Sequence, residues 1–117
     1  MIVVVTDAAL HELLSSGTLI TTTWPRAHED VFVLVKVLQI TVPTLAEVLS
    51  TGLITLLAAN ALTSEITLAT ERATLQAVAL TQHGERVADP QTSADQVFRV
   101  DILDVAAEGR SASKVAR

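Results

Sequence analysis

The stretch VFVLVKVLQITV, residues Val31 to Val42, constrains the fold more than any other part of this chain, because it is almost wholly apolar and its only charge is Lys36. Apart from that lysine, both sets of alternate positions are apolar over its first eight residues. This pattern is typical of a strand that is covered on both faces and is usually central in a sheet. The β-branched residues also favour a strand over a helix. We therefore predict that Val31–Val42 is a buried strand.

The same stretch allows a second interpretation, a small membrane-associated protein that uses residues 31–60. A transmembrane helix needs roughly 20 predominantly apolar residues. A window of that length from Val31 contains Lys36 and Glu47. Each charge near its centre opposes insertion by roughly 2.5–3.5 kcal/mol, whereas each Leu, Ile or Val favours insertion by only some 0.3–0.6 kcal/mol. A folded domain is therefore the favoured interpretation, and membrane association stays an alternative.

Composition excludes several classes of protein. The 117 residues provide for one hydrophobic core, and half of them are apolar, which excludes a globally disordered chain. The formal net charge of −5 opposes contact with phosphate backbones, so we expect no nucleic-acid partner. The absence of cysteine excludes disulfides and thiolate chemistry. Together with N-terminal residues that do not resemble a signal peptide, it predicts a cytoplasmic location.

Local signals predict the elements of the N-terminal part. Residues 1–5 form a β-branched run that is typical of a short strand. Asp7 then provides an N-cap for a helix that ends at Gly17. The segment Thr18–Trp24 is again rich in residues that favour strands, so we predict a second strand there.

Two helical regions are predicted after the apolar stretch. Residues 44–62 have apolar side chains near helical spacing, with a break at Gly52 because glycine disfavours a helix interior. Residues 63–83 carry one apolar stripe and are predicted as a single helix. The many threonines of this segment keep a β-hairpin that turns near Glu71 and Arg72 as the alternative.

The C-terminal part completes the predicted fold. Residues 97–105 alternate between apolar and polar side chains, which predicts a half-exposed strand near a sheet edge. Together these elements predict a small single α+β domain over residues 1–106, with helices packed on one face of a mixed four-stranded sheet. Residues 107–117 are small, polar and basic, and are predicted to form a flexible C-terminal tail.

Three histidines lie close to acidic residues and are the candidates for a metal or catalytic site: His11, His28 and His83. Imidazole and carboxylate groups are good zinc ligands. Neighbouring residues of a helix or strand point in different directions, however, so none of these pairs presents two ligands to one ion. The chain also lacks a nucleophile elbow and a Gly-rich phosphate loop. We therefore predict no catalytic, metal-binding or cofactor-binding residue, and a small enzyme with a His–carboxylate site stays an alternative.

The apolar content exceeds what a domain of this size readily buries, which indicates a surface for a partner. We predict a non-enzymatic interaction or assembly module that forms a homo-oligomer or binds a protein partner. The predicted contact residues lie in the region after Gly52 or on the C-terminal strand, where an exposed edge would pair with another chain. They are Leu53, Leu56, Leu57, Phe98 and Val100. A last alternative is the product of a recent or non-conserved reading frame without selected function.

Overall fold

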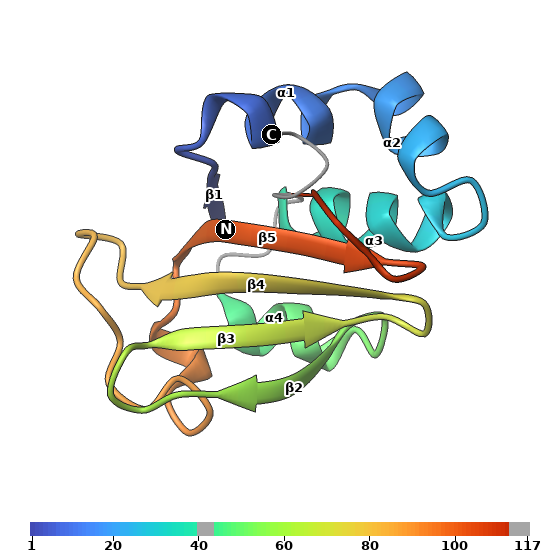
Figure 1. Cartoon of the computed structure of the whole chain (residues 1–117). Coiled ribbons are helices and arrows are strands. Elements are labelled where there is room, and N and C mark those ends of the chain that lie inside the picture. Colours follow the sequence, from blue (N-terminus) through green and yellow to red (C-terminus); the bar gives the residue numbers. More distant parts are fainter. Residues whose placement is uncertain (40–43, 113–117) are drawn as a thin grey trace.

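A mixed β-sheet runs through the domain, and helices lie against it (Figure 1). In the computed structural model, which describes residues 1–39 and 44–112, six strands pair in the order β1-β5-β4-β3-β2, with β6 beside β5. The strands are β1 Ile2–Val4, β2 Thr55–Ala59, β3 Glu65–Ala69, β4 Ala73–Leu80, β5 Arg99–Ala107 and β6 Arg110–Ser111. The predicted α+β class is confirmed, and the described sheet has six strands where the sequence pattern predicts four.

The strands from β2 to β5 form an antiparallel meander, and β1 joins β5 in parallel. One side of β5 pairs with β4 along nearly all of its length. Its other side pairs with β1 near Arg99 and with β6 near Ala107. β5 therefore lies one strand in from this edge of the sheet, which agrees with the prediction that it is near an edge, and β2 stands at the opposite edge. The half-exposed pattern of β5 arises because one face of the sheet is open.

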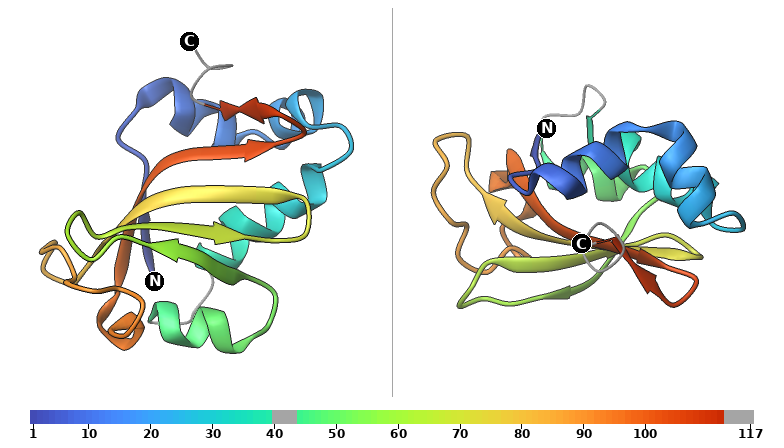
Figure 2. Two further views of the ribbon diagram at one scale, coloured as in Figure 1. Left: turned by 60° about the horizontal axis from the view of Figure 1, so that its bottom comes forward. Right: turned by 45° about the horizontal axis from the view of Figure 1, so that its top comes forward.

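The helices of the described residues gather on one side of the sheet (Figure 2). They are α1 Ala8–Ser15, α2 Gly17–Thr23, α3 His28–Gln39 and α4 Leu45–Ser50, and the short 3₁₀ turn η1 spans Ala94–Gln96. β4 shows how the sheet separates a covered face from an open one. Leu75, Ala77 and Ala79 are buried, whereas Gln76 between them is exposed. The core is mostly aliphatic, and Trp24 is its largest fully buried side chain.

The apolar stretch that begins at Val31 is a helix and not the predicted strand. Val31, Leu34, Val35 and Leu38 are buried in α3. Their spacing of three or four residues places them on one side of a helix. An almost wholly apolar stretch satisfies both the two-residue and the 3.6-residue period, so its pattern alone does not distinguish the two structures. The end of the predicted strand, residues 40–42, lies outside the described residues.

The predicted strand Thr18–Trp24 is also wrong, because this segment is helical. α1 begins as predicted, with the Asp7 carboxylate accepting a backbone hydrogen bond at 3.0 Å. Gly17 does not end the helical region but is the first residue of α2. The hydroxyl of Ser16 caps α2 by accepting a backbone N–H at 3.2 Å. Threonine hydroxyls inside α2 donate to carbonyls one turn earlier, which satisfies them within the helix.

The break predicted at Gly52 is confirmed. α4 ends before it, and Gly52 has φ +76°, a left-handed conformation that glycine adopts without steric cost. The residues that follow form the strand β2 and not a second helical piece.

Residues 63–83 form the β3–β4 hairpin, so the predicted helix is wrong and the alternative hairpin is correct. The two strands are joined at residues 70–72, where the hairpin alternative places its turn. α3 holds this turn, because Asp30 Oδ2 accepts hydrogen bonds from Thr70 Oγ1 and Arg72 N–H, both at 2.8 Å. As strands, these segments also pair with β2 on one side and with β5 on the other.

Residues 107–112 continue the sheet, although the sequence assigns them to a C-terminal tail. β5 extends to the first of them, β6 follows, and Ala112 is buried. Trp24 Nε1–H donates to Arg110 O at 3.2 Å, which ties the end of α2 to β6. The folded part of the described chain therefore extends past the predicted boundary at residue 106. Residues 113–117 lie outside the described residues.

Candidate functional site

The edge strand β2 and the residues beside it carry the three most exposed large apolar side chains of the described residues. Leu53, before the strand, is 59% exposed, Leu57 within it is 62% exposed, and Leu62 after it is 93% exposed. Leu57 stands at a β-bulge, where the register with β3 shifts by one residue. We call Leu53, Leu57 and Leu62 the leucine surface.

The residues of this edge have no charged side chain of their own, and the Arg86 guanidinium reaches only its end, where it donates to Thr63 O at 2.9 Å. All residues between Glu47 and Glu65 are uncharged, and the segment includes the end of α4, all of β2 and the turn into β3. Natural sheets commonly protect an edge strand with charged side chains or proline. β2 has neither a charged side chain nor a proline, and the bulge at Leu57 interrupts its regular pairing at one residue.

A half-open groove of about 530 Å³ lies beside β2 on the open face of the sheet. The residues that line it are Ala58, Ala59, Asn60, Ala61, Glu65, Ile66, Thr67, Gln76 and Leu103. Leu103 is 44% exposed and adds an apolar side chain from β5 to the uncharged residues of β2. Among the described residues, no buried side-chain nitrogen or oxygen lacks a hydrogen-bond partner. The lining of the groove combines apolar side chains such as Ile66 and Leu103 with polar ones such as Glu65 and Gln76.

The structure separates the two predicted groups of contact residues. Leu53 and Leu57 are exposed at the β2 edge, whereas Leu56 is half-buried and packs against the core. Val100 is fully buried on β5, and Phe98, just before β5, is half-buried. Because β3 and β4 lie between β2 and β5, these five residues do not form one surface.

Sequence reasoning did not find Leu62 or the role of Leu103 in this surface. Leu62 lies in the turn between β2 and β3, whereas the sequence pattern places it at the end of the predicted helical region 44–62. Asn60 Oδ1 accepts a hydrogen bond from Leu62 N–H at 2.8 Å, and an asparagine that favours turns is the signal available in the sequence. Leu103 is 44% exposed because none of the described helices covers its face of the sheet, and the alternating pattern of one strand does not show which face the helices cover.

The three histidines lie on separate elements. His11 is exposed on α1, His28 is the first residue of α3, and His83 lies in the turn after β4. His28 Nδ1 lies 3.0 Å from Pro25 O, and its ring meets the Phe32 ring edge-on at a centroid distance of 6.3 Å. In residues 1–39 and 44–112, no group of three His, Asp or Glu side chains could hold a metal ion.

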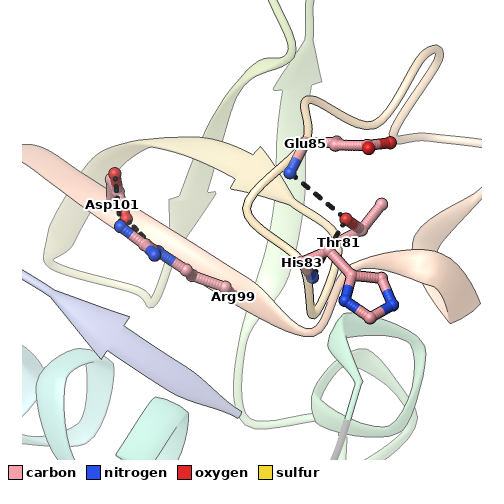
Figure 3. Close-up of polar contacts among 5 residues, drawn as sticks. All are labelled: Thr81, His83, Glu85, Arg99 and Asp101. Carbon is pink, nitrogen blue, oxygen red and sulfur yellow. Dashed lines mark hydrogen bonds and ion pairs between the residues drawn. The ribbon is translucent and has the colours of Figure 1, made fainter.

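Polar contacts near His83 stabilise the local backbone (Figure 3). Thr81 Oγ1 accepts hydrogen bonds from His83 N–H at 3.3 Å and from Glu85 N–H at 3.2 Å. On β5, Arg99 Nε donates to Asp101 Oδ1 at 2.8 Å. This hydrogen bond and the charge of Asp101 raise the pKa of the Arg99 guanidinium above its ordinary value. The His83 ring and the Glu85 carboxylate point away from the ion pair, so these groups do not form one reactive site.

Comparisons with protein-family models, with curated proteins and with solved structures find no match to this chain. In the part of the chain that the structure describes, no helix has the length and apolar character needed to cross a membrane. α3 has 12 residues, which span about 18 Å, whereas the hydrocarbon core of a bilayer is about 30 Å thick. The described residues of the membrane alternative, 31–39 and 44–60, include part of α3 and all of α4 and β2.

Proposed function

We propose that this protein is a non-enzymatic interaction and assembly module whose contact surface is the leucine surface along β2. The observation that carries the proposal is the exposure of Leu53, Leu57 and Leu62 beside an uncharged strand edge. Exposed apolar surface on a small domain commonly marks a contact with a partner. A free edge adds backbone N–H and C=O groups with which another chain can pair.

A homo-oligomer is the simplest assembly for this surface, because one patch serves both subunits of a two-fold interface. The net charge of −5 on each copy opposes association. The uncharged segment from residue 48 to residue 64 keeps that repulsion away from the contact, where solvent and salt screen it. We place this assembly in the cytoplasm, because a cysteine-free chain needs no oxidising compartment.

The leucine side chains alone support weak association. Full burial of a leucine contributes about 1.5–3 kcal/mol, so covering the exposed parts of the three side chains in both copies contributes on the order of 8 kcal/mol. Association costs an estimated 4–15 kcal/mol in lost freedom of motion. Because these two free energies are similar, further contacts across the interface decide the affinity, and we expect an oligomer whose population falls on dilution.

Light scattering over a dilution series tests this proposal. We expect a mass above 12.4 kDa at high micromolar concentration, with a fall toward 12.4 kDa on dilution. Leu57→Asp should reduce the oligomer at every concentration, because it places a charge in the contact. Leu19→Asp is the matched control, since Leu19 is 40% exposed on α2, and this variant should keep the wild-type mass. A wild-type mass of 12.4 kDa at every concentration would contradict the proposal.

A further inference from the structure

We infer that the contact is a pair of strands, in which the β2 strands of two copies lie antiparallel across a two-fold axis and join the two sheets into one. The inference rests on the proposed function, because it names the partner and the bonds of the same surface. β3 pairs with one side of β2, and no strand of the described residues pairs with the other side. The unpaired side is therefore where a second strand can add.

The hydrogen bonds between β2 and β3 show which backbone groups face the free edge. Asn60 N–H donates to Glu65 O at 2.8 Å. Hydrogen-bonded and non-hydrogen-bonded pairs alternate along an antiparallel ladder, so the adjacent pair, Ala59 with Ile66, is not hydrogen-bonded. Ala59 therefore directs its N–H and C=O away from β3 and toward the free edge.

A second residue beyond the bulge faces the same way. Thr70 N–H donates to Ala73 O at 3.0 Å, so Leu68, two residues earlier in β3, also bonds to β4 and not to β2. The partner of Leu68 in β2 is Leu56. Leu56 therefore also directs its backbone groups to the free edge, and the two residues together offer donors and acceptors at both halves of the strand.

The chemistry of the edge favours a second copy over a charged partner. Residues 48–64 offer no charge that would complement an acidic or a basic peptide, and none that would repel an identical strand. Two identical strands complement each other when they pair antiparallel, because N–H groups of each strand then face C=O groups of the other. The two-fold axis repeats every such hydrogen bond with the roles of the two copies exchanged.

The area that a stable contact needs is larger than two paired β2 strands provide, and the leucine surface can supply the difference. A standard interface buries about 800 Å² on each partner, which is about one eighth of the protein's 6357 Å² surface. A pair of five-residue strands is smaller than this, so side chains at both ends of β2 have to contribute. Leu53 precedes β2 and Leu62 follows it. In an antiparallel pair, the start of one strand lies beside the end of the other, which brings Leu53 toward the partner's Leu62.

Ala59→Pro tests the strand pairing, because proline removes the N–H that faces the free edge and leaves the hydrogen bonds to β3 in place. We expect the dissociation constant from light scattering to rise about tenfold or more, since each copy loses a hydrogen bond. Gln82→Pro is the matched control, because Gln82 is the exposed second residue of the turn that follows β4, where Gly84 N–H donates to Thr81 O and proline is tolerated. An oligomer of Ala59→Pro as tight as the wild type, in a variant with wild-type melting at low concentration, would overturn the inference.

Hydrogen exchange on the wild-type protein decides the question if Ala59→Pro does not fold. The amides of Leu56 and Ala59 should exchange about tenfold more slowly at high than at low protein concentration, whereas those of β4 should not respond. If the protein self-associates and the two β2 amides do not respond, the strand pairing is overturned and the proposed function stands. If the protein is a monomer at every concentration, both are overturned.

Discussion

Asp30 connects α3 to the turn of the β3–β4 hairpin, and we predict that Asp30→Ala destabilises the fold. The half-buried carboxylate accepts two hydrogen bonds of 2.8 Å, from the Thr70 hydroxyl and the Arg72 backbone N–H. A hydrogen bond to a charged group contributes about 1.5–3 kcal/mol, and partial exposure to solvent places these two at the lower end. We therefore expect Asp30→Ala to lower the free energy of unfolding by about 2–3 kcal/mol.

Urea unfolding followed by the fluorescence of Trp24 measures this change. Trp24 is the only tryptophan and is fully buried, so unfolding exposes it to water. With a dependence of about 2 kcal/mol per molar urea, the unfolding midpoint should fall by about 1 M. Glu29→Ala is the matched control, because Glu29 is an exposed acidic residue in the same first turn of α3. Loss of its interaction with the helix dipole should lower stability by only about 0.3–1 kcal/mol.

Equal destabilisation by the two variants would refute the reasoning, because charge near the helix N-terminus, and not hydrogen bonding to the turn, would then explain the effect. A double-mutant cycle with Thr70→Val sharpens the test. Asp30→Ala and Thr70→Val remove the two ends of one hydrogen bond, so their effects on the free energy of unfolding should be non-additive by about 1 kcal/mol. Additive effects would show that this bond does not stabilise the fold.

Three other substitutions should change the melting temperature in stated directions. Asp7→Ala removes the N-cap of α1 and should destabilise the protein by about 1 kcal/mol, whereas an unchanged melt would show that the cap contributes nothing. Gly52→Ala should destabilise the protein by about 1 kcal/mol, because alanine is strained at the left-handed φ of +76°. No atom lies within 4 Å of the added Cβ, so no new packing contact offsets this strain. Gly17→Ala, in α2, should stabilise by about 0.5 kcal/mol, since its Cβ makes an ordinary contact of 3.5 Å with Phe32. The same sign for both glycine variants would contradict this account.

Local chemistry made part of this fold predictable. Asp7 is the N-cap of α1 because its side chain bonds to a backbone N–H three residues later, which involves no distant part of the chain. Gly52 ends a helical region because its backbone conformation is left-handed. The hairpin that turns near Glu71 and Arg72 is an alternative from the sequence because the many threonines of this segment disfavour a helix.

Segments whose pattern fits two structures were not predictable. The apolar residues from Val31 onward fit a strand or a helix, and packing selects the helix by burying Val31, Leu34 and Leu38 together. Ile66 and Leu68 fit a helical stripe with their neighbours, but they alternate on one face of β3 once β2 and β4 pair with that strand. The sheet therefore overrides a weak local preference for helix.

Part of the candidate surface can likewise be predicted from the sequence, whereas the rest depends on the tertiary structure. The sequence singles out Leu53 and Leu57 because they lie in an uncharged apolar segment, and the structure places both side chains on the surface. The burial of Val100 and the exposure of Leu62 depend on which strand stands at the sheet edge. Strand order arises from pairing between residues far apart in the chain, such as β1 with β5, and no local pattern contains that information. The sequence alone thus indicated excess apolar surface, and the tertiary structure decided where it lies.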